Sequence, residues 1–136
     1  MDIRVSYMAG KGKSEKVVAV FQLKGDLDAR SYEQLQTNAS AVFEAGTRDM
    51  LLDLAAVPYI SSAGLRAIQY IFNLLRTDAP EESQAAMNQG LRDGTFKSPH
   101  LKLFNPSPAV LQVLRATGFD MFLEIHDELE IAVTSF

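Results

Sequence analysis

The sequence predicts an α/β domain in which a small, mostly parallel mixed sheet is wound with about four helices. Short apolar segments with strand character alternate along the chain with segments whose apolar residues recur at helical spacing. Strands that alternate with helices favour parallel βαβ units joined by right-handed crossovers. The 136 residues are enough to bury a sizeable core, and we expect residues 1–136 to form one domain.

Two strands and a helix are expected first along the chain. Residues 3–8 alternate apolar and polar side chains, and residues 17–23 are almost all apolar, so that with the glycines between them they predict a β-hairpin. A helix should follow from Ser31, which stands at an N-cap position with Gln34 at the spacing of a capping box. Apolar residues then recur at helical spacing. Gly46 follows the last of them and favours a helix end there.

The middle of the chain predicts a buried strand, a helix and an insertion. Residues 49–54 are nearly continuously apolar, which is the pattern of a central strand covered on both faces. A helix should begin at Ser62 and end near residues 78–80, where a proline stands. Residues 77–99 are polar and lack a sustained apolar stripe, with at most a short helix around 81–89. We expect this insertion to contribute little core and to be cleaved early by proteases.

The last third predicts strand, helix, strand and helix. Residues 101–104 are the next strand, and the Ser-Pro pair at 107–108 is a typical helix start. Residues 119–125 are expected to form a last short strand. A terminal helix that carries Leu129, Ala132 and Val133 should begin at Asp127.

The strand-to-helix connection that ends in two serines is the most informative segment. An apolar strand ends near Leu54, a tight turn follows, and Ser61 and Ser62 precede the next helix directly. The first turn of a helix has unpaired backbone amides and the positive end of the helix dipole. A hydroxyl group there tolerates added negative charge, which suits a reversible phosphate.

Three motifs in order resemble the STAS family, the bacterial anti-sigma-factor antagonists. The first is Asp53-Leu54 followed at family spacing by Ser62-Ala63-Gly64-Leu65. The second is the strand end at residues 21–28, and the third is the strand and Asn-x-Ser helix start at residues 101–107. The resemblance spans roughly residues 15–134 and implies a small mixed sheet wound with helices, in agreement with the pattern of the sequence.

The resemblance also implies a partner switch. The family serine falls on Ser62, which a kinase-type anti-sigma factor would phosphorylate and a serine phosphatase would restore. The family usually has Asp where this chain has Ser61, so Ser61 is the fallback acceptor. The implied partner-binding residues are Asp26, Asp28, Ser61, Ser62, Ala63 and Gly64. Arg66 joins them on its position, because a cation in the first turn is disfavoured by the helix dipole and could bind an acidic partner residue or the phosphate. The chain would then be a binding partner and a substrate, and not an enzyme.

Simpler interpretations stand beside these. A serine before a helix is often only an N-cap, and Asp26 and Asp28 have the residue type of ordinary turns. Arg66 could be a surface charge of little energetic consequence. Within the family, the alternatives are a structural module of a multi-protein signalling scaffold and an accessory subunit of a lipid transporter.

Composition and motifs argue against several other classes. The net charge of −4 lacks the basic footprint of a nucleic-acid-binding protein, and without cysteine there is no disulfide framework or thiolate chemistry. No apolar run has the length of a membrane span, and the first residues lack a signal-peptide core, so a cytoplasmic protein is expected. His100 and His126 lack metal-ligand spacing, and no Gly-x-Ser-x-Gly motif gives Ser62 a catalytic context. We expect no metal and no cofactor.

Overall fold

A five-stranded mixed sheet in the order β1-β2-β3-β4-β5 forms the centre of the computed structural model, which describes residues 1–10, 16–77 and 96–136. The strands are β1 (Asp2–Ala9), β2 (Val17–Lys24), β3 (Asp49–Ala56), β4 (Leu101–Phe104) and β5 (Glu124–His126). Strand β1 is antiparallel to β2, and the other three neighbouring pairs are parallel. The predicted hairpin and the mostly parallel mixed sheet are therefore confirmed.

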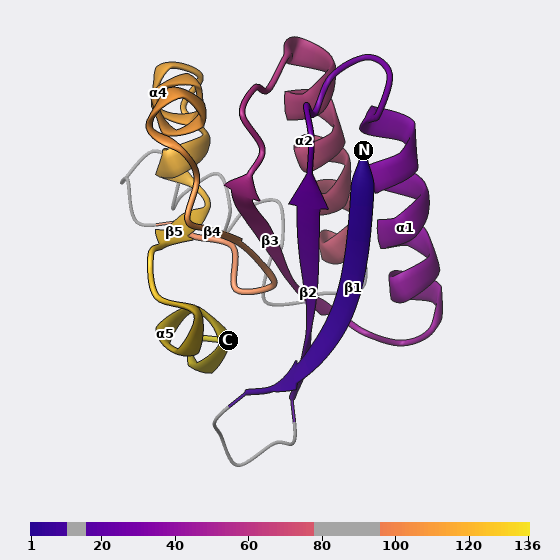
Figure 1. Cartoon of the computed structure of the whole chain (residues 1–136). Coiled ribbons are helices and arrows are strands. Elements are labelled where there is room, and N and C mark those ends of the chain that lie inside the picture. Colours follow the sequence, from indigo (N-terminus) through magenta and orange to yellow (C-terminus); the bar gives the residue numbers. More distant parts are fainter. Residues whose placement is uncertain (11–15, 78–95) are drawn as a thin grey trace.

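Helices cover the two faces of this sheet unequally (Figure 1). The described residues form the helices α1 (Tyr32–Glu44), α2 (Ser62–Arg76), α4 (Pro108–Ala116) and α5 (Leu129–Thr134), with a 3₁₀ turn, η2 (Phe119–Met121). Helices α1, α2 and α4 pack against one face with the larger core, whereas α5 packs on the opposite face with a smaller cluster. The predicted fold class, with about four helices, is confirmed.

Strand β3 lies in the middle of the sheet and supplies both cores. Met50, Leu52 and Leu54 face α1 and α2, whereas Leu51 alternates to the other face and packs beside α5. All four are fully buried. The continuous apolar run of the sequence is therefore explained by burial on both faces.

Most of the predicted helix boundaries are confirmed. Ser107 caps α4, because its Oγ accepts a hydrogen bond from the Val110 amide at 3.3 Å, and Pro108 opens the helix. Gly46 and Gly118 follow α1 and α4 in the left-handed region, at φ of 108° and 81°. A left-handed residue after a helix favours glycine, because other residues meet their own carbonyl oxygen there.

The capping box predicted at Ser31 is wrong. Ser31 precedes α1, but its side chain does not cap the helix. Its Oγ instead donates to the Asp26 carbonyl at 2.7 Å and accepts from the Asp28 amide at 3.0 Å. Gln34 donates to the Met1 carbonyl and not back to Ser31. The serine hydroxyl therefore stabilises the loop before the helix.

Two predictions near the C-terminus are also wrong. Residues 119–125 form the 3₁₀ turn η2 and then only the start of β5, because Gly118 reverses the chain and the Met121 amide bonds back to its carbonyl. Helix α5 begins at Leu129 and not at Asp127. Of the three apolar residues expected on this helix, Ala132 and Val133 are buried and Leu129 is exposed.

Most of the predicted insertion, including the short helix suggested around 81–89, lies outside the described residues. Its final residues do contribute to the core, contrary to expectation. The Phe96 ring packs edge-on against Phe72 with centroids 6.2 Å apart. Ser98 is 1% exposed, and its Oγ accepts hydrogen bonds from the His100 and Leu101 amides. These residues therefore hold the start of β4 in place.

Candidate functional site

The loops that follow β2 and β3 are joined at one edge of the sheet. Because β2 and β3 are parallel, their carboxyl ends lie side by side. The Gly25 amide donates to Ala56, and the Leu27 amide donates to Tyr59, both at 3.0 Å. The Ser61 amide donates in turn to the Leu27 carbonyl at 3.0 Å. The sequence therefore brings the predicted acidic and serine segments together, as the strand pattern requires.

Buried side chains hold the junction between the two loops, beneath the exposed surface. Leu27 and Ile60 form an isolated parallel bridge between the two loops, and both side chains are buried. Ser31 fixes the acidic loop through its hydrogen bonds to Asp26 and Asp28. The two loops thus form one surface with a fixed spacing.

The two serines have different roles. Ser61 is the N-cap of α2, because its Oγ accepts a hydrogen bond from the Gly64 amide at 3.4 Å and its own backbone is extended. Ser62 is the first helical residue and is exposed. Its hydroxyl makes no hydrogen bond to any other residue that the structure describes. The interpretation of Ser62 as a simple N-cap is therefore wrong, and Ser62 is the more accessible hydroxyl.

Gly64 allows α2 to approach the acidic loop closely. A Cβ atom at this position would lie 2.3 Å from the Leu27 carbonyl oxygen and 2.9 Å from the side chains of Leu27 and Ile60. No side chain fits that space without moving the backbone of the neighbouring loop. Ala63 beside it is also buried. Both residues therefore act beneath the surface, by bringing α2 close to the loop.

Three exposed residues lie around Ser62 at the surface. Tyr59 precedes it in the loop and is 52% exposed. Asp26 is exposed on the acidic loop, and Arg66 is exposed one helical turn beyond Ser62. We call Asp26, Tyr59, Ser62 and Arg66 the serine surface. Sequence reasoning did not identify Tyr59, although a tyrosine in the loop just before the motif was a usable signal, since exposed aromatic residues often anchor interfaces.

Asp28 serves mainly the local turn. Its Oδ1 accepts a hydrogen bond from the Arg30 amide at 2.9 Å, and its carbonyl accepts from the Ser31 and Tyr32 amides. This is the turn chemistry that a short acidic side chain provides. Asp26 makes no such side-chain bond to the described residues, so it is the freer of the two carboxylates.

Helix α1 adds a second tyrosine beside the serine surface. The Tyr32 hydroxyl donates to Glu33 Oε1 at 3.0 Å. This hydrogen bond and the negative charge of Glu33 raise the pKa of Tyr32, whereas the positive charge of Arg66 acts in the opposite direction. Arg66 is thus electrostatically in reach of α1, and the Tyr32 phenol stays neutral at physiological pH.

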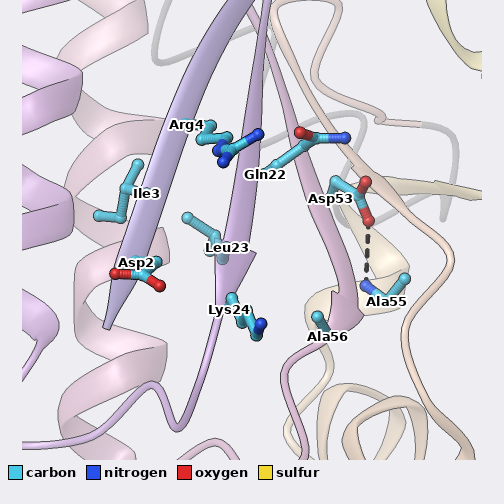
Figure 2. Close-up of a pocket in the computed structure, with 9 residues that line it drawn as sticks. All are labelled: Asp2, Ile3, Arg4, Gln22, Leu23, Lys24, Asp53, Ala55 and Ala56. Atoms are coloured by element: carbon cyan, nitrogen blue, oxygen red, sulfur yellow. Dashed lines mark hydrogen bonds between the residues drawn. The ribbon is translucent and has the colours of Figure 1, made fainter.

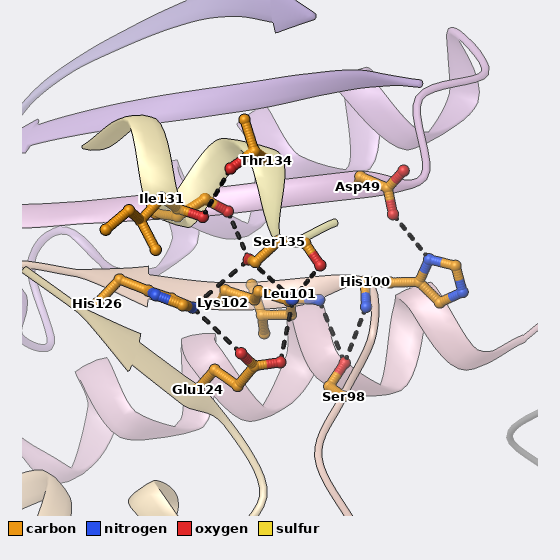
Figure 3. Close-up of polar contacts among 11 residues, drawn as sticks. Asp49, Ser98, His100, Leu101, Lys102, Glu124, His126, Ile131, Thr134 and Ser135 are labelled. Carbon is orange, nitrogen blue, oxygen red and sulfur yellow. Dashed lines mark hydrogen bonds and ion pairs between the residues drawn. The ribbon is translucent and has the colours of Figure 1, made fainter. Parts of the chain in front are cut away.

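Each of the two histidines lies within hydrogen-bonding distance of a carboxylate (Figure 3). His100 Nδ1 lies 2.9 Å from Asp49 Oδ1 at the opposite edge of the sheet, where β3 and β4 begin. His126 Nε2 lies 3.2 Å from Glu124 Oε1. Neither contacts Ser62, so the structure assembles no serine–histidine pair there. Among residues 1–10, 16–77 and 96–136, no group of three or more His, Asp or Glu side chains is placed to hold a metal ion.

An open groove lies on the other face of the sheet. It has a volume of about 640 Å³ and lies over β1, β2 and β3, in the part that α5 leaves uncovered (Figure 2). Its polar side chains include Arg4, Gln22, Lys24 and Asp53. Asp53 Oδ1 accepts a hydrogen bond from the Ala55 amide at 3.0 Å and so closes the end of β3. The groove does not include Ser62.

The fold and the serine surface together define a small α/β domain with an exposed hydroxyl at a helix start. Residues 13–79 match the family model of the STAS domain. This match identifies the segment, about half of the chain, as a STAS domain. The chain is 28% identical over 114 residues to BtrV of Bordetella bronchiseptica, which is described as an anti-sigma factor antagonist, and the match covers 84% of this chain and 82% of that protein.

Solved structures of similar proteins share the fold. SpoIIAA in its unphosphorylated form, an anti-sigma factor antagonist, is 17% identical with a TM-score of 0.66, over 97% of this chain and 93% of that one. A STAS domain protein from Planctomyces limnophilus is 18% identical with a TM-score of 0.64, over 98% and 96%. A sulfate transporter family protein from Wolinella succinogenes is 18% identical with a TM-score of 0.55, over 85% and 81%.

No helix in the described parts of the chain is long and apolar enough to cross a membrane.

Proposed function

We propose that this chain is an anti-sigma factor antagonist that works as a partner switch. The unphosphorylated protein docks its serine surface on a kinase-type anti-sigma factor and thereby releases the sigma factor. The kinase then transfers the γ-phosphoryl group of ATP to the Ser62 hydroxyl, and the phosphorylated protein leaves. A serine phosphatase hydrolyses the phosphate ester and restores docking. The protein is the regulated ligand of these enzymes, and the cycle takes place in the cytoplasm.

The observation that carries the proposal is the position of Ser62. It is an exposed hydroxyl at the first position of α2 and is not used for capping, because Ser61 performs that role. A kinase needs a hydroxyl that it can reach without unfolding the substrate, and Ser62 meets this condition. The descriptions of BtrV and SpoIIAA as anti-sigma factor antagonists support the same function. A SpoIIAA structure in the phosphorylated form also has this fold, with a TM-score of 0.58.

The charge of the surface explains how the phosphate would act. A phosphoserine carries about −1.5 to −2 charge at neutral pH. Asp26 already contributes one negative charge to the serine surface, and Arg66 contributes one positive charge. Phosphorylation would therefore make a nearly neutral docking surface strongly negative. Desolvating that charge against a partner built for a neutral hydroxyl weakens binding.

The backbone surroundings of Ser62 argue that the fold survives phosphorylation. A negative group at the start of a helix interacts favourably with the helix dipole, by about 0.3–1 kcal/mol at an exposed site. Leu27, Ile60 and Gly64, which bring the two loops together, are buried and do not depend on the Ser62 hydroxyl for their contacts. The switch would thus change the surface and not the fold.

Tyr59 is the expected anchor of the docked state. Large, exposed aromatic side chains commonly provide the main apolar contact at an interface. Tyr59→Ala should weaken docking at least about tenfold, which needs only about 1.4 kcal/mol. Tyr7, which is equally exposed on the distant end of β1, provides the matched control, and Tyr7→Ala should bind normally.

Phosphate mapping tests the proposal. The cognate kinase-type anti-sigma factor, identified from the neighbouring genes, would be incubated with the protein and ATP. Mass spectrometry should locate one phosphate on Ser62, and Ser62→Ala should accept none. Phosphate found mainly on Ser61 would contradict the assignment of Ser62.

The scaffold and transporter alternatives remain distinguishable by their partners. The fold similarity to a sulfate transporter family protein shows that this architecture also occurs in a transporter family. Co-purification with a transporter ATPase subunit would favour that alternative, and homotypic assembly in solution would favour the scaffold.

A further inference from the structure

Ser62 and Arg66 are the first and fifth residues of α2, and both are exposed. Residues four apart on a helix lie on one side of it, with Cβ atoms about 5–6 Å apart. Long helical side chains lean toward the N-terminus and cover the preceding turn. The Arg66 side chain can therefore reach the surface directly above Ser62.

Arg66 lacks an ion-pair partner among the residues that the structure describes. Helix α2, Ser62–Arg76, contains no acidic residue with which it could pair along the helix. The place of Arg66 near the start of a helix is unfavourable for a cation, because the dipole is positive there. The position therefore has a cost that a nearby anion would remove.

We propose that Arg66 is the internal counter-charge of a phosphate on Ser62, and that phosphorylation draws its guanidinium group back over the first turn of α2. The inference rests on the proposed phosphorylation of Ser62 and adds a positioning residue to it. A guanidinium group presents paired N–H donors that match phosphate oxygens. The order along the helix is also the favourable one, with the anion four residues before the cation.

The neighbouring acidic groups do not compete equally for Arg66. Asp28 is engaged by the Arg30 amide, and Glu33 by the Tyr32 hydroxyl. Asp26 remains on the serine surface and would repel a phosphate on Ser62. Arg66 would offset that repulsion, which makes a stable phosphorylated state compatible with an acidic loop.

The pairing gives one modification two effects on docking. Before phosphorylation, Arg66 is available to an acidic group of the partner. Afterwards the same guanidinium is held by the phosphate within α2. The partner thus meets an added negative charge and loses a positive one in the same step.

Phosphorus NMR provides the test. Phosphoserine would be installed at position 62 during translation, in the wild type, Arg66→Gln and Arg66→Lys. The second phosphate pKa is read from the ³¹P shift during a pH titration. We expect it to be lowest in the wild type and highest in Arg66→Gln, with Arg66→Lys between them, because a nearby cation favours the dianion. Arg4→Gln, on the opposite face of the sheet, should leave the pKa at the wild-type value.

Docking of the unphosphorylated proteins gives an independent readout. Arg66→Gln should bind the kinase about threefold more weakly than wild type, as loss of one exposed ion pair predicts. Circular dichroism would first verify that each variant folds. The same phosphate pKa in wild type and Arg66→Gln would overturn the pairing. Because the phosphate is installed without a kinase, failure of the kinase to modify Ser62 would contradict only the proposed function.

Discussion

Leu27 bonds through both of its backbone groups to the loop that carries the serines: its amide donates to Tyr59, and its carbonyl accepts from the Ser61 amide, both at 3.0 Å. Its side chain is fully buried. A displacement of either loop therefore moves the other. A partner that contacts Asp26 and Ser62 together meets two loops held at a fixed spacing.

The first prediction concerns the close approach of α2 to Leu27. Gly64→Ala should destabilise the protein by about 1–3 kcal/mol, because the new methyl group would meet a backbone oxygen that cannot move alone. Alanine is otherwise the better helix former by about 1 kcal/mol. A lower free energy of unfolding would therefore identify the contact with the Leu27 carbonyl oxygen as the cause. Urea unfolding monitored by circular dichroism measures it.

Gly10→Ala is the matched control for this change. A Cβ atom at Gly10 meets nothing closer than 3.5 Å, and its φ is not in the left-handed region. Its unfolding free energy should stay within about 0.5 kcal/mol of wild type. Equal stability of the two variants would show that the close approach of α2 to Leu27 does not require glycine at position 64.

The second prediction separates the two serines by stability. Ser61→Ala removes the N-cap of α2 and should lower the unfolding free energy by about 0.5–2 kcal/mol, toward the lower end because the bond is long. Ser62→Ala removes an exposed hydroxyl without a partner in the described chain. This substitution should change the unfolding free energy by less than about 0.5 kcal/mol. Thermal unfolding of both variants measures the difference, and a larger loss in Ser62→Ala would contradict the assigned cap.

The third prediction concerns the attachment of the C-terminus. Lys102 Nζ donates to the carbonyl and Oγ of Ser135 at 2.9 and 3.0 Å, and it lies 3.0 Å from Glu124 Oε2 (Figure 3). Lys102→Met keeps the aliphatic length and removes all three contacts. The substitution should lower the unfolding free energy by about 1–3 kcal/mol, because the Ser135 carbonyl loses its charged donor.

Amide exchange locates the effect of this change. Exchange should accelerate mainly in α5, whose buried residues Ala132 and Val133 cover the second core. Lys24→Met is the control, since Lys24 is exposed at the end of β2 and should be replaced with little effect. Unchanged exchange in α5 of Lys102→Met would mean that the apolar contacts alone hold this helix.

The fourth prediction is that Ser62→Asp preserves the fold. An aspartate at the first helical position is favoured by the helix dipole, so its melting temperature should stay within a few degrees of wild type. Scanning calorimetry measures it. A large drop would mean that negative charge at Ser62 acts by unfolding the site.

The boundaries that sequence predicted well are those set by local chemistry. Ser107 with Pro108, Gly46 and the apolar run of β3 each determine structure through their own backbone or burial preferences. The edge where the serines and the acidic loop meet was also predictable, because parallel strands place their carboxyl ends together.

The errors arose where distant residues decided the outcome. Ser31 has the sequence of a capping box, yet its hydroxyl is taken by Asp26 and Asp28. The segment after Gly118 has strand composition but turns back on itself. The choice of Ser61 over Ser62 as the cap depends on the bond from the Ser61 amide to Leu27, which local pattern does not encode.

Docking of the phosphorylated and unphosphorylated protein on the kinase tests the central claim most directly. Isothermal titration calorimetry would compare wild type, the protein phosphorylated on Ser62, and Ser62→Ala kept in the presence of ATP. We predict that the phosphate weakens binding at least about tenfold, and that Ser62→Ala binds like wild type and is never released. Equal affinity of the phosphorylated and unphosphorylated forms would contradict the partner switch.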